Sequence, residues 1–367
     1  MPLVSVLLPV YNGGAYLDAA LGSILRQDYR RIEVIAIDDG STDASLRILE
    51  KFRRADSRIR IVSRENRGLI ASLNEGLELA GGELVARMDA DDIAYPFRLS
   101  RQVAVLQRDP AVAICGGGVD SLVGSRLFRG IGDPIFATGD LRILSLFFTI
   151  FIHSTVVYNR DVLPDALLHY DARYPHAEDF DLFRRITAHF PAVMMEESLI
   201  AYRTHDGSVT SRHKKRMRAT HLDIVGENLR QEGLMPDHRL LRSIAKEATP
   251  ESVRAAADYV LRLETAVAAT SAPSRTSYEA GWLNLFYFIY TMIADEKRPE
   301  LTRQFLDETG KWGLIRRRER YAWQVGSLAP GLSLLSLAAN KRLGEAIRYM
   351  SSVPASSILP PAGHWQE

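Results

Sequence analysis

Short apolar runs alternate with helical patterns along roughly the first hundred residues of the chain. Each run has the length of a single strand and is followed by polar or glycine-rich positions. Between the runs, apolar residues recur every three or four positions, which is the spacing of one helical face. The predicted strands are Val4–Leu8, Glu33–Ile37, Ile59–Val62 and Leu84–Met88. The predicted buried helical faces are Leu17, Ala20, Leu21, Ile24 and Leu25, then Leu46, Leu49 and Phe52, then Leu69, Leu73 and Leu77.

This strict alternation predicts an α/β fold built on a doubly wound, mainly parallel sheet. In such sheets, ligands bind outside the carboxyl ends of the strands. We therefore expect a site at one rim of the sheet, formed by the polar segments that follow the four strands. These segments are 9–12, 38–41, 64–68 and 89–92.

The pattern becomes less regular after about residue 110. Short strands are expected at Ala113–Cys115, Ser154–Tyr158 and Leu199–Tyr202, and helices near Asp140–Phe148 and Asp179–His189. From about Ser211 the chain is mostly helical, which predicts a domain boundary there. We expect one domain over 1–210, a C-terminal helical domain over 211–350 and a loose tail over 351–367.

Composition excludes several classes of protein. The 46 Lys and Arg residues nearly cancel the 45 Asp and Glu residues, so no overall field attracts nucleic acid or membrane, and anion binding has to be local. Cys115 is the only cysteine, which excludes an intrachain disulfide and a cysteine-based zinc cluster. These features are typical of a cytoplasmic protein.

Two apolar stretches bear on membrane association. Met1–Val10 has no basic region before it and is too short for a signal peptide, so we expect a buried strand. Trp282–Ala294 is shorter than the roughly 20 residues that span a bilayer. The apolar helix over 282–293 and a later apolar segment over 328–337 fit a helical bundle. Next to the basic cluster 316–318, they also fit a peripheral contact at the inner face of a membrane.

Asp89-Ala90-Asp91 follows an apolar strand, so both carboxylates are expected at the rim of the sheet. At this spacing, one acid can bind a ribose hydroxyl while the other binds a hard divalent cation, which prefers oxygen ligands. The alternative is a capping turn before a helix. Asp38 and Asp39 end the second strand in a similar way, although 41–43 already supplies a helix cap there.

The motifs together resemble the inverting family-2 glycosyltransferases of the GT-A fold. The resemblance covers residues 3 to about 210 and does not extend to the C-terminal third. The motifs occur in the order of the family. They are Pro9-Val10-Tyr11-Asn12, Asp38-Asp39-Gly40-Ser41-Thr42-Asp43, Asn66-Arg67-Gly68, Met88-Asp89-Ala90-Asp91-Asp92, Ala177-Glu178-Asp179-Phe180-Asp181-Leu182 and Tyr202-Arg203-Thr204-His205.

The resemblance implies a GT-A catalytic domain over 1–210, with a nucleotide-sugar half over 1–110 and an acceptor half over 111–210. It implies that Pro9, Tyr11 and Asp39 cradle the base and ribose, that Asp89 contacts the ribose, and that Arg67 or a neighbour approaches the nucleotide. Asp91 and His205 would hold the metal, for which Mn²⁺ and Mg²⁺ both fit. A lone histidine is also often structural.

Asp179 is implied as the catalytic base that takes the proton of the acceptor hydroxyl. Glu178 and His153 are weaker candidates on the acceptor side. Glu178 and Asp179 also fit a simpler role, since carboxylates stabilise the positive end of a helix dipole. The basic residues from Arg212 to Arg218 fit either a lid over the diphosphate or a solvated helix face.

We therefore expect a metal-dependent inverting glycosyltransferase. The expected donor is a nucleotide-sugar, with UDP as the default, and the expected acceptor is a saccharide or lipid-linked saccharide in surface glycan synthesis. Two alternatives remain at this point. One is a non-catalytic protein that binds nucleotide-sugars, and the other is a nucleotidyltransferase, although 9–14 lacks the basic residues that a phosphate loop of that class needs.

Overall fold

The computed structural model describes residues 1–130, 139–205, 213–237, 239–326 and 352–355. The chain divides into two compact units. One comprises the described residues within Met1–Arg142, Thr149–Arg212 and Ser352–Glu367, and the other those within Ile143–Phe148 and His213–Ser351. Arg212, the apolar segment 328–337 and most of the expected tail lie outside the described residues. None of the described helices combines the length and apolar character that crossing a bilayer requires.

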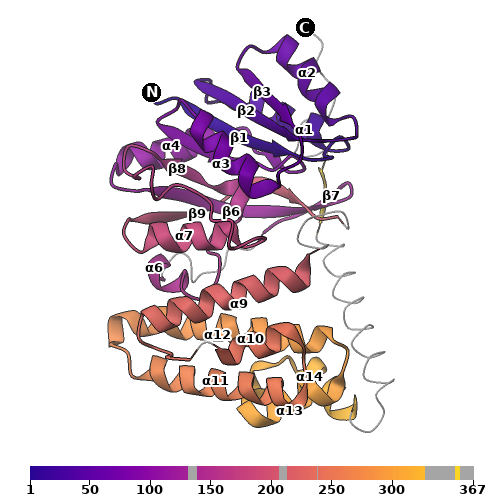
Figure 1. Cartoon of the computed structure of the whole chain (residues 1–367), viewed down its shortest axis with the longest axis vertical. Helices are drawn as coiled ribbons and strands as arrows, with labels where there is room; N and C mark the ends of the chain where they lie inside the picture. The colour runs from indigo at the N-terminus through magenta and orange to yellow at the C-terminus, as the bar shows by residue number, and fades with distance from the viewer. Residues whose placement is uncertain (131–138, 206–212, 238, 327–351, 356–367) are drawn as a thin grey trace. The chain divides into compact units, whose positions relative to one another are not determined.

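The first unit is an α/β fold around a mainly parallel sheet (Figure 1), as the sequence predicts. Its strand order runs β10-β7-β6-β8-β4-β1-β2-β3, and β9 pairs with β5 and β6. The four predicted strands are β1 (Val4–Val10), β2 (Ile32–Asp39), β3 (Ile59–Arg64) and β4 (Leu84–Arg87), which pair in parallel in the order β4-β1-β2-β3.

Helices cover both faces of this parallel part. Val4, Val6, Leu8 and Val10 of β1 belong to the same apolar core as residues of α1 (Leu17–Leu25), α2 (Ser45–Ala55) and α4 (Arg98–Arg108). Leu7 points to the opposite face, because a Cβ on Gly76 of α3 (Leu69–Leu79) would lie 3.2 Å from its side chain. Alternate residues of one strand therefore serve two helical layers.

Leu46 was predicted in the buried stripe of α2, and that prediction is wrong. The helix begins at Ser45 rather than directly after 41–43, and Leu46 is 36% exposed, whereas Leu49 and Phe52 are buried. The buried face of α2 therefore includes fewer residues than the apolar pattern of its sequence predicts.

The second half of the first unit departs most from prediction. The strand at 113–115 is ten residues long in the structure, β6 (Ile114–Val123), and includes the glycine run 116–118. The strand at 199–202 is the end of β9 (Ala192–Arg203). The strand expected over Ser154–Tyr158 begins only at Val157, as β8 (Val157–Asn159), because 153–155 form a 3₁₀ turn. The remaining elements are β5 (Ile93–Ala94), β7 (Arg126–Phe128), β10 (Val353–Pro354) and α7 (Glu178–Thr187).

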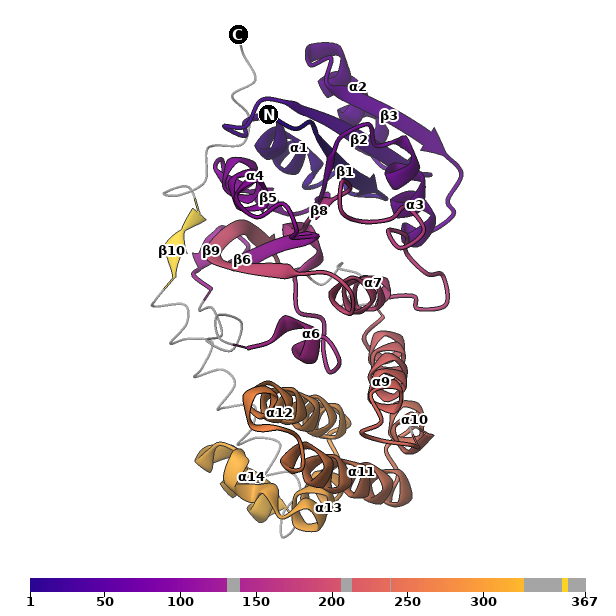
Figure 2. The same cartoon turned by 90° about the vertical axis from the view of Figure 1, so that its left-hand side faces the viewer.

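The second unit is helical (Figure 2). The apolar residues of the long helix α12 are mostly buried, among them Leu285, Phe286, Ile289 and Ile293. They therefore form a core within this unit, as the bundle interpretation requires. The helices are α9 (Lys214–Gln231), α10 (Arg239–Lys246), α11 (Pro250–Ala268), α12 (Ala272–Asp295), α13 (Pro299–Thr309) and α14 (Arg317–Gly326), with a 3₁₀ turn over Lys311–Leu314.

The helical unit also contains a short segment from the middle of the chain, 143–148. The helix expected over Asp140–Phe148 is limited to α6 (Leu141–Leu144). His221 and Asn228 of α9 bond the carbonyls of Phe147 and Leu146, at 3.2 Å in each case. A Cβ on Gly281 would lie 2.2 Å from the Phe147 ring, so only glycine allows this approach.

Candidate active site

The four polar segments that follow β1, β2, β3 and β4 meet at one rim of the sheet. In the parallel register, Val10 lies opposite Asp38, and Asp39 lies opposite Arg64. Leu7 lies opposite Arg87, so β4 ends beside β1 just before Asp89. Parallel pairing alone brings these ends together, because every strand points the same way.

Asp39 is buried and its carboxylate has partners within the protein. Its Oδ1 accepts a hydrogen bond from the backbone N–H of Arg67 at 2.8 Å, and its Oδ2 accepts one from Gly68 at 2.9 Å. Arg64 also forms an ion pair with it. Arg64 and the backbone N–H groups of Arg67 and Gly68 therefore offset the repulsion between the Asp38 and Asp39 carboxylates, and no nucleotide is needed for this. Asp39 orders the loop that carries Arg67, whose own side chain is exposed.

Asp38 and the loop after β1 complete this side of the rim. Asp38 accepts hydrogen bonds from the backbone N–H of Ser41 and from the Ser63 hydroxyl, at 3.2 and 2.7 Å. Asn12, at φ 51°, accepts a bond from the backbone N–H of Thr42 at 2.8 Å, which joins the two loops. Pro9 is the penultimate residue of β1, and Tyr11, directly after the strand, is 56% exposed beside this junction. An exposed ring on an ordered loop can stack on a flat ligand.

Asp89, Asp91 and Asp92 form a tight acidic cluster, with one carboxylate oxygen of each within 4.8 Å of the others. Asp89 is 30% exposed and forms an ion pair with the buried Arg87. Burial raises the pKa of Asp89 while Arg87 opposes that effect. Asp91 is 31% exposed and presents its carboxylate at the same rim.

Asp92 faces inward. Its two carboxylate oxygens accept hydrogen bonds from the Ser154 hydroxyl at 2.5 Å and from the backbone N–H of Arg203 at 2.8 Å. Burial, and then the negative charges of Asp89 and Asp91, raise the pKa of Asp92 to about 8. Asp92 therefore ties the acidic loop to the end of β9 and to the turn before β8. A divalent cation near these carboxylates would favour their ionised forms.

The end of β9 brings His205 to the acidic cluster. His205 Nε2 lies 3.0 Å from Asp91 Oδ2. The Arg203 Nε donates to the backbone carbonyl of Asp91 at 2.8 Å. The Tyr16 ring packs against both residues, with its centroid 4.9 Å from the His205 ring and 4.6 Å from the Arg203 guanidinium. One nitrogen and the nearby carboxylate oxygens are the ligand types that Mn²⁺ accepts.

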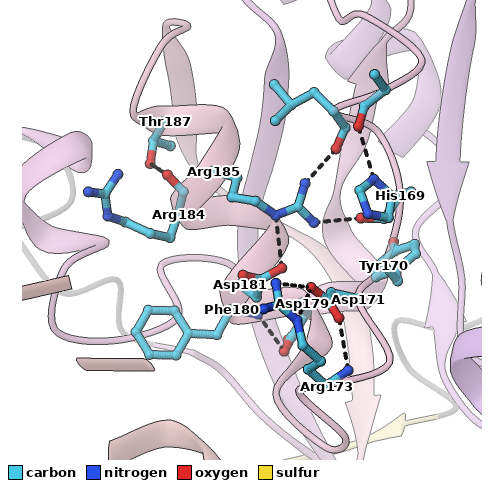
Figure 3. A network of polar contacts seen from close by, with 12 residues as sticks. His169, Tyr170, Asp171, Arg173, Asp179, Phe180, Asp181, Arg184, Arg185 and Thr187 are labelled. Carbon is cyan, nitrogen blue, oxygen red and sulfur yellow. Dashed lines mark hydrogen bonds and ion pairs between the residues drawn. The ribbon is translucent and has the colours of Figure 1, made fainter. Parts of the chain in front are cut away.

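Glu178 and Asp179 occupy the first turn of α7 (Figure 3). Asp179 Oδ1 accepts a hydrogen bond from the backbone N–H of Phe180 at 2.8 Å. Burial raises the pKa of Asp179 to about 6, and the charge of Asp89 contributes. Burial and the charge of Asp179 raise the pKa of Glu178 to about 7. A carboxylate that titrates near neutrality suits general base chemistry.

Arginines anchor the loop in front of this helix (Figure 3). Arg185 forms an ion pair with Asp181 at 2.9 Å and donates to the carbonyls of Leu167 and His169. Asp171 accepts two hydrogen bonds from the Arg173 guanidinium. Asp181 is therefore engaged in holding the loop, whereas no arginine forms an ion pair with Asp179 among the described residues.

His153 is part of a buried aromatic network. Its Nε2 lies 2.7 Å from the Tyr170 hydroxyl, which in turn lies 3.0 Å from the Tyr158 hydroxyl. Burial, and then the charge of Arg87, lower the pKa of His153 well below its usual range. Its 9% exposure leaves little surface for an acceptor.

Three residues that hold the site together had no predicted role: Arg87, Arg203 and Tyr16. Arg87 carried a usable signal, since it is a charge inside the apolar strand Leu84–Arg87. Arg203 carried one as well, since it lies in the motif Tyr202-Arg203-Thr204-His205. Tyr16 had none, because its ring contacts Arg203 and His205, which are far away in the chain.

The family profile described as Glycosyl transferase family 2 matches residues 5–167. A Haemophilus influenzae protein described as an uncharacterized glycosyltransferase is 33% identical over 239 residues, which cover 62% of this chain and 73% of that protein. The matched region contains the rim segments after β1 to β4.

Two structures share the fold. TarS residues 1–349 of S. aureus, in complex with UDP-GlcNAc, aligns with a TM-score of 0.55 and 18% identity over 79% of this chain and 90% of that one. The mannosyltransferase PcManGT of Pyrobaculum calidifontis, in complex with GDP-Man and Mn²⁺, aligns with a TM-score of 0.51 and 20% identity over 84% of this chain and 86% of that one. At these identities the likeness concerns the fold.

Proposed function

This chain belongs to glycosyltransferase family 2 and has the GT-A fold, and we propose that it transfers a sugar from a nucleotide-sugar to an acceptor hydroxyl with inversion at the anomeric carbon. One observation carries this proposal. The Asp179 carboxylate has its pKa raised to about 6 by burial, and the charge of Asp89 contributes to that value. A carboxylate suited to act as a base therefore lies within electrostatic reach of the acidic loop.

The rim residues would bind the donor. Tyr11 is exposed and would stack on the base, with Pro9 beneath the same loop. Asp39 holds the 64–68 loop in place through hydrogen bonds. This loop would form one edge of the pocket for the base and ribose, so Asp39 would contribute to that pocket. Arg67 would approach the nucleotide, and Asp89 would accept a hydrogen bond from a ribose hydroxyl. UDP is the donor nucleotide we propose.

A divalent cation fits the residues present. Asp91 and His205 would hold it, since both are partly exposed at the rim and their ligand atoms are 3.0 Å apart. When bound, Mn²⁺ or Mg²⁺ supplies Lewis-acid stabilisation of the charge that develops on the leaving diphosphate. Asp92 accepts a hydrogen bond at each carboxylate oxygen, from Ser154 and from Arg203, and would support the loop rather than bind the ion.

Asp179 would act as the general base. Its carboxylate takes the proton of the acceptor hydroxyl while the acceptor oxygen forms a bond to the anomeric carbon. The bond from that carbon to the diphosphate oxygen breaks, and the nucleoside diphosphate leaves on the opposite face. A single displacement of this kind inverts the anomeric centre without a covalent intermediate.

The acceptor side is proposed around Glu178, which is 5% exposed at the start of α7. His153 would support this side only indirectly, through its bond to Tyr170. We propose a saccharide or lipid-linked saccharide of surface glycan synthesis as the acceptor, used in the cytoplasm. Exposed Tyr321 follows the basic cluster 316–318, and this composition supports peripheral contact with a membrane.

For the domains we keep the boundaries predicted above. Residues 1–210 would be the catalytic domain, with donor and acceptor halves that meet near 110. Residues 211–350 would be the helical domain, and 351–367 the tail. The compact units support a boundary near 211, with two differences: 143–148 belongs to the helical unit, and the described residues 352–355 belong to the first unit, where β10 pairs with β7.

A thermal-shift screen of UDP-, dTDP- and GDP-sugars with Mn²⁺, Mg²⁺ or EDTA tests donor and metal together. Because a ligand that binds the native state stabilises it, one donor should raise the Tm in a metal-dependent way. Absence of a rise with every donor, while the protein is folded, would contradict the proposal.

Asp179→Asn then tests catalysis. The variant should keep the donor-dependent rise in Tm but release nucleoside diphosphate about 10²- to 10⁴-fold more slowly with a panel of oligosaccharide and polyprenyl-phosphate-linked acceptors. Asp165→Asn is the matched control, because Asp165 is 90% exposed. Donor binding without transfer in the wild type would instead favour a non-catalytic sugar-nucleotide binding protein.

A further inference from the structure

Arg87 is a buried charge at the last position of the apolar strand β4. Its side chain is 4% exposed. A buried guanidinium is costly unless it is paired and hydrogen-bonded, so its surroundings have to explain its presence. Arg87 forms an ion pair with Asp89, but its Nε makes no hydrogen bond to any of the described residues. Protein partners therefore satisfy this guanidinium only in part.

The backbone at Arg87 is held firmly on both sides. Its N–H donates to the carbonyl of Val156 at 3.0 Å. Its carbonyl accepts a hydrogen bond at 2.8 Å from Nη2 of Arg98, which is itself buried and also donates to Gln102. These contacts fix the point from which the Arg87 side chain leaves the strand, and the burial of that side chain limits its movement away from Asp89.

The groups around Arg87 come from the donor side and the acceptor side of the proposed site. The positive charge of Arg87 acts on Asp89 in the acidic loop and on Glu178 and Asp179 at the start of α7. It acts also on the buried network of His153 and Tyr170. Arg87 therefore interacts electrostatically with both Asp89 and Asp179, which have different roles in the proposed reaction.

We propose that Arg87 is a positioning residue of the transfer reaction, which holds the Asp89 carboxylate for the donor and places a positive charge beside the base Asp179. The inference rests on the proposed function, since it presumes that Asp89 contacts the donor and Asp179 takes the proton. It explains why a costly buried cation stands at the end of β4. A hydrophobic residue there would fill the same space but leave Asp89 without its ion-pair partner.

Arg87 is a positive group in the electrostatic environment of Asp179. Burial raises the pKa of Asp179, Arg87 lowers it, and Asp89 raises it again. Removal of the Arg87 charge should therefore move the pKa of the base upward. The other titratable groups that interact with Asp179 are Tyr158 of β8, Tyr170 of the following loop and Glu178 of α7.

The test compares Arg87→Met and Arg87→Gln, which lack the charge, with Arg87→Lys, which keeps it. The measurement is kcat and donor KM for transfer between pH 5 and 9, with metal and donor saturating for kcat. The acidic limb of kcat in the neutral variants should move up by about one pH unit or more, the usual effect of losing a nearby opposite charge. Arg87→Lys should keep the wild-type limb. All three Arg87 variants should raise the donor KM, because each removes the guanidinium that can bind the Asp89 carboxylate through two hydrogen bonds.

Arg60→Met is the matched control, since Arg60 is exposed on β3 of the same sheet. It should leave the pH limb and the donor KM unchanged. A neutral Arg87 variant that folds and keeps both the wild-type limb and donor KM overturns the inference. If neither neutral variant folds, Arg87→Lys decides, and an unchanged donor KM there overturns the inference as well.

Failure of the proposed function is a separate result. It would appear as full transfer activity in Asp179→Asn, whatever the behaviour of the Arg87 variants. Loss of transfer in Asp179→Asn, together with an unmoved pH limb and an unchanged donor KM in a folded Arg87→Met, overturns only the role of Arg87.

Discussion

His205 Nε2 lies 3.0 Å from Asp91 Oδ2, although 114 positions separate the two residues in the chain. The end of β9 makes this contact possible. Arg203 donates through its backbone N–H to Asp92 and through its side chain to the carbonyl of Asp91, so the strand end is tied to the acidic loop. The pair is thus held by the surrounding structure before any ligand binds, which is how preorganised sites are built.

Removal of either member of this pair should weaken metal binding. Loss of a group that merely supports a metal ligand typically costs 10- to 100-fold in affinity, so Asp91→Asn and His205→Ala should each weaken Mn²⁺ binding at least about 10-fold. Calorimetric titration with Mn²⁺ in the presence of donor measures this. His189→Ala is the control, because His189 is exposed. Unaltered Mn²⁺ affinity in both variants would remove the metal role.

Asp179 should destabilise the fold at neutral pH. Its pKa is raised to about 6 from the usual value near 4, so the folded state favours the protonated form. Its favourable contribution to stability is present below about pH 4 and is lost as pH rises through about 6. Asp179→Asn should therefore melt at a higher temperature than the wild type at pH 8, with the difference shrinking toward pH 4.

Differential scanning calorimetry in EDTA, without donor, makes this comparison. Asp165→Asn should show no pH-dependent difference, because that carboxylate is exposed. A lower Tm for Asp179→Asn at pH 8 would mean that the ionised carboxylate has stabilising partners, in conflict with the raised pKa.

Gly40 should be intolerant of any side chain. It has φ 75°, and an added Cβ would lie 2.7 Å from the backbone nitrogen of Asn66. Gly124 has φ 57° but open space around the same position. Gly124→Ala should therefore cost only the backbone penalty of about 1 kcal/mol. Gly40→Ala should cost clearly more and also weaken donor binding, since the 64–68 loop has to shift. Urea unfolding of both variants measures the difference, and equal costs would contradict the steric argument.

Phe147 should be a major support of the helical unit. It is fully buried, and truncation of a buried phenylalanine costs about 3–5 kcal/mol. Phe147→Ala should accordingly reduce hydrogen-exchange protection in α9 and α12, where its neighbours His221 and Gly281 lie. Tyr321→Ala is the control, because Tyr321 is 67% exposed. Unchanged protection in α12 of the Phe147 variant would show that 143–148 is not needed by this core.

The strands of the first half were predictable because local pattern and tertiary role agree there. A run such as Val4–Val10 is apolar at nearly every position, as a parallel strand buried on both faces has to be. Local pattern and tertiary role disagreed at positions where the expected packing neighbour is absent or where a different partner takes its place. Leu46 carries a helical apolar pattern but no layer covers it, and Ser154 lies in a turn whose hydroxyl bonds Asp92 instead of continuing β8.

Asp39 and His153 illustrate the same limit at the site. Their residue types and positions suggested ligand contacts, yet Asp39 bonds the 64–68 loop and His153 bonds Tyr170. A sequence indicates which groups are available to react or bind. It does not indicate which protein groups will satisfy them first, because those partners come from distant segments.

The family, the alternation of strands and helices, and the carboxylates at the ends of β2 and β4 could be read from the order of neighbouring residues, because each of these features is local in the chain. Only the tertiary structure decided that His205 meets Asp91, that Arg87 lies within electrostatic reach of both Asp89 and Asp179, and that 143–148 belongs to the helical unit. These relations depend on distances in space between segments that the chain separates, and electrostatic and packing energies depend on those distances.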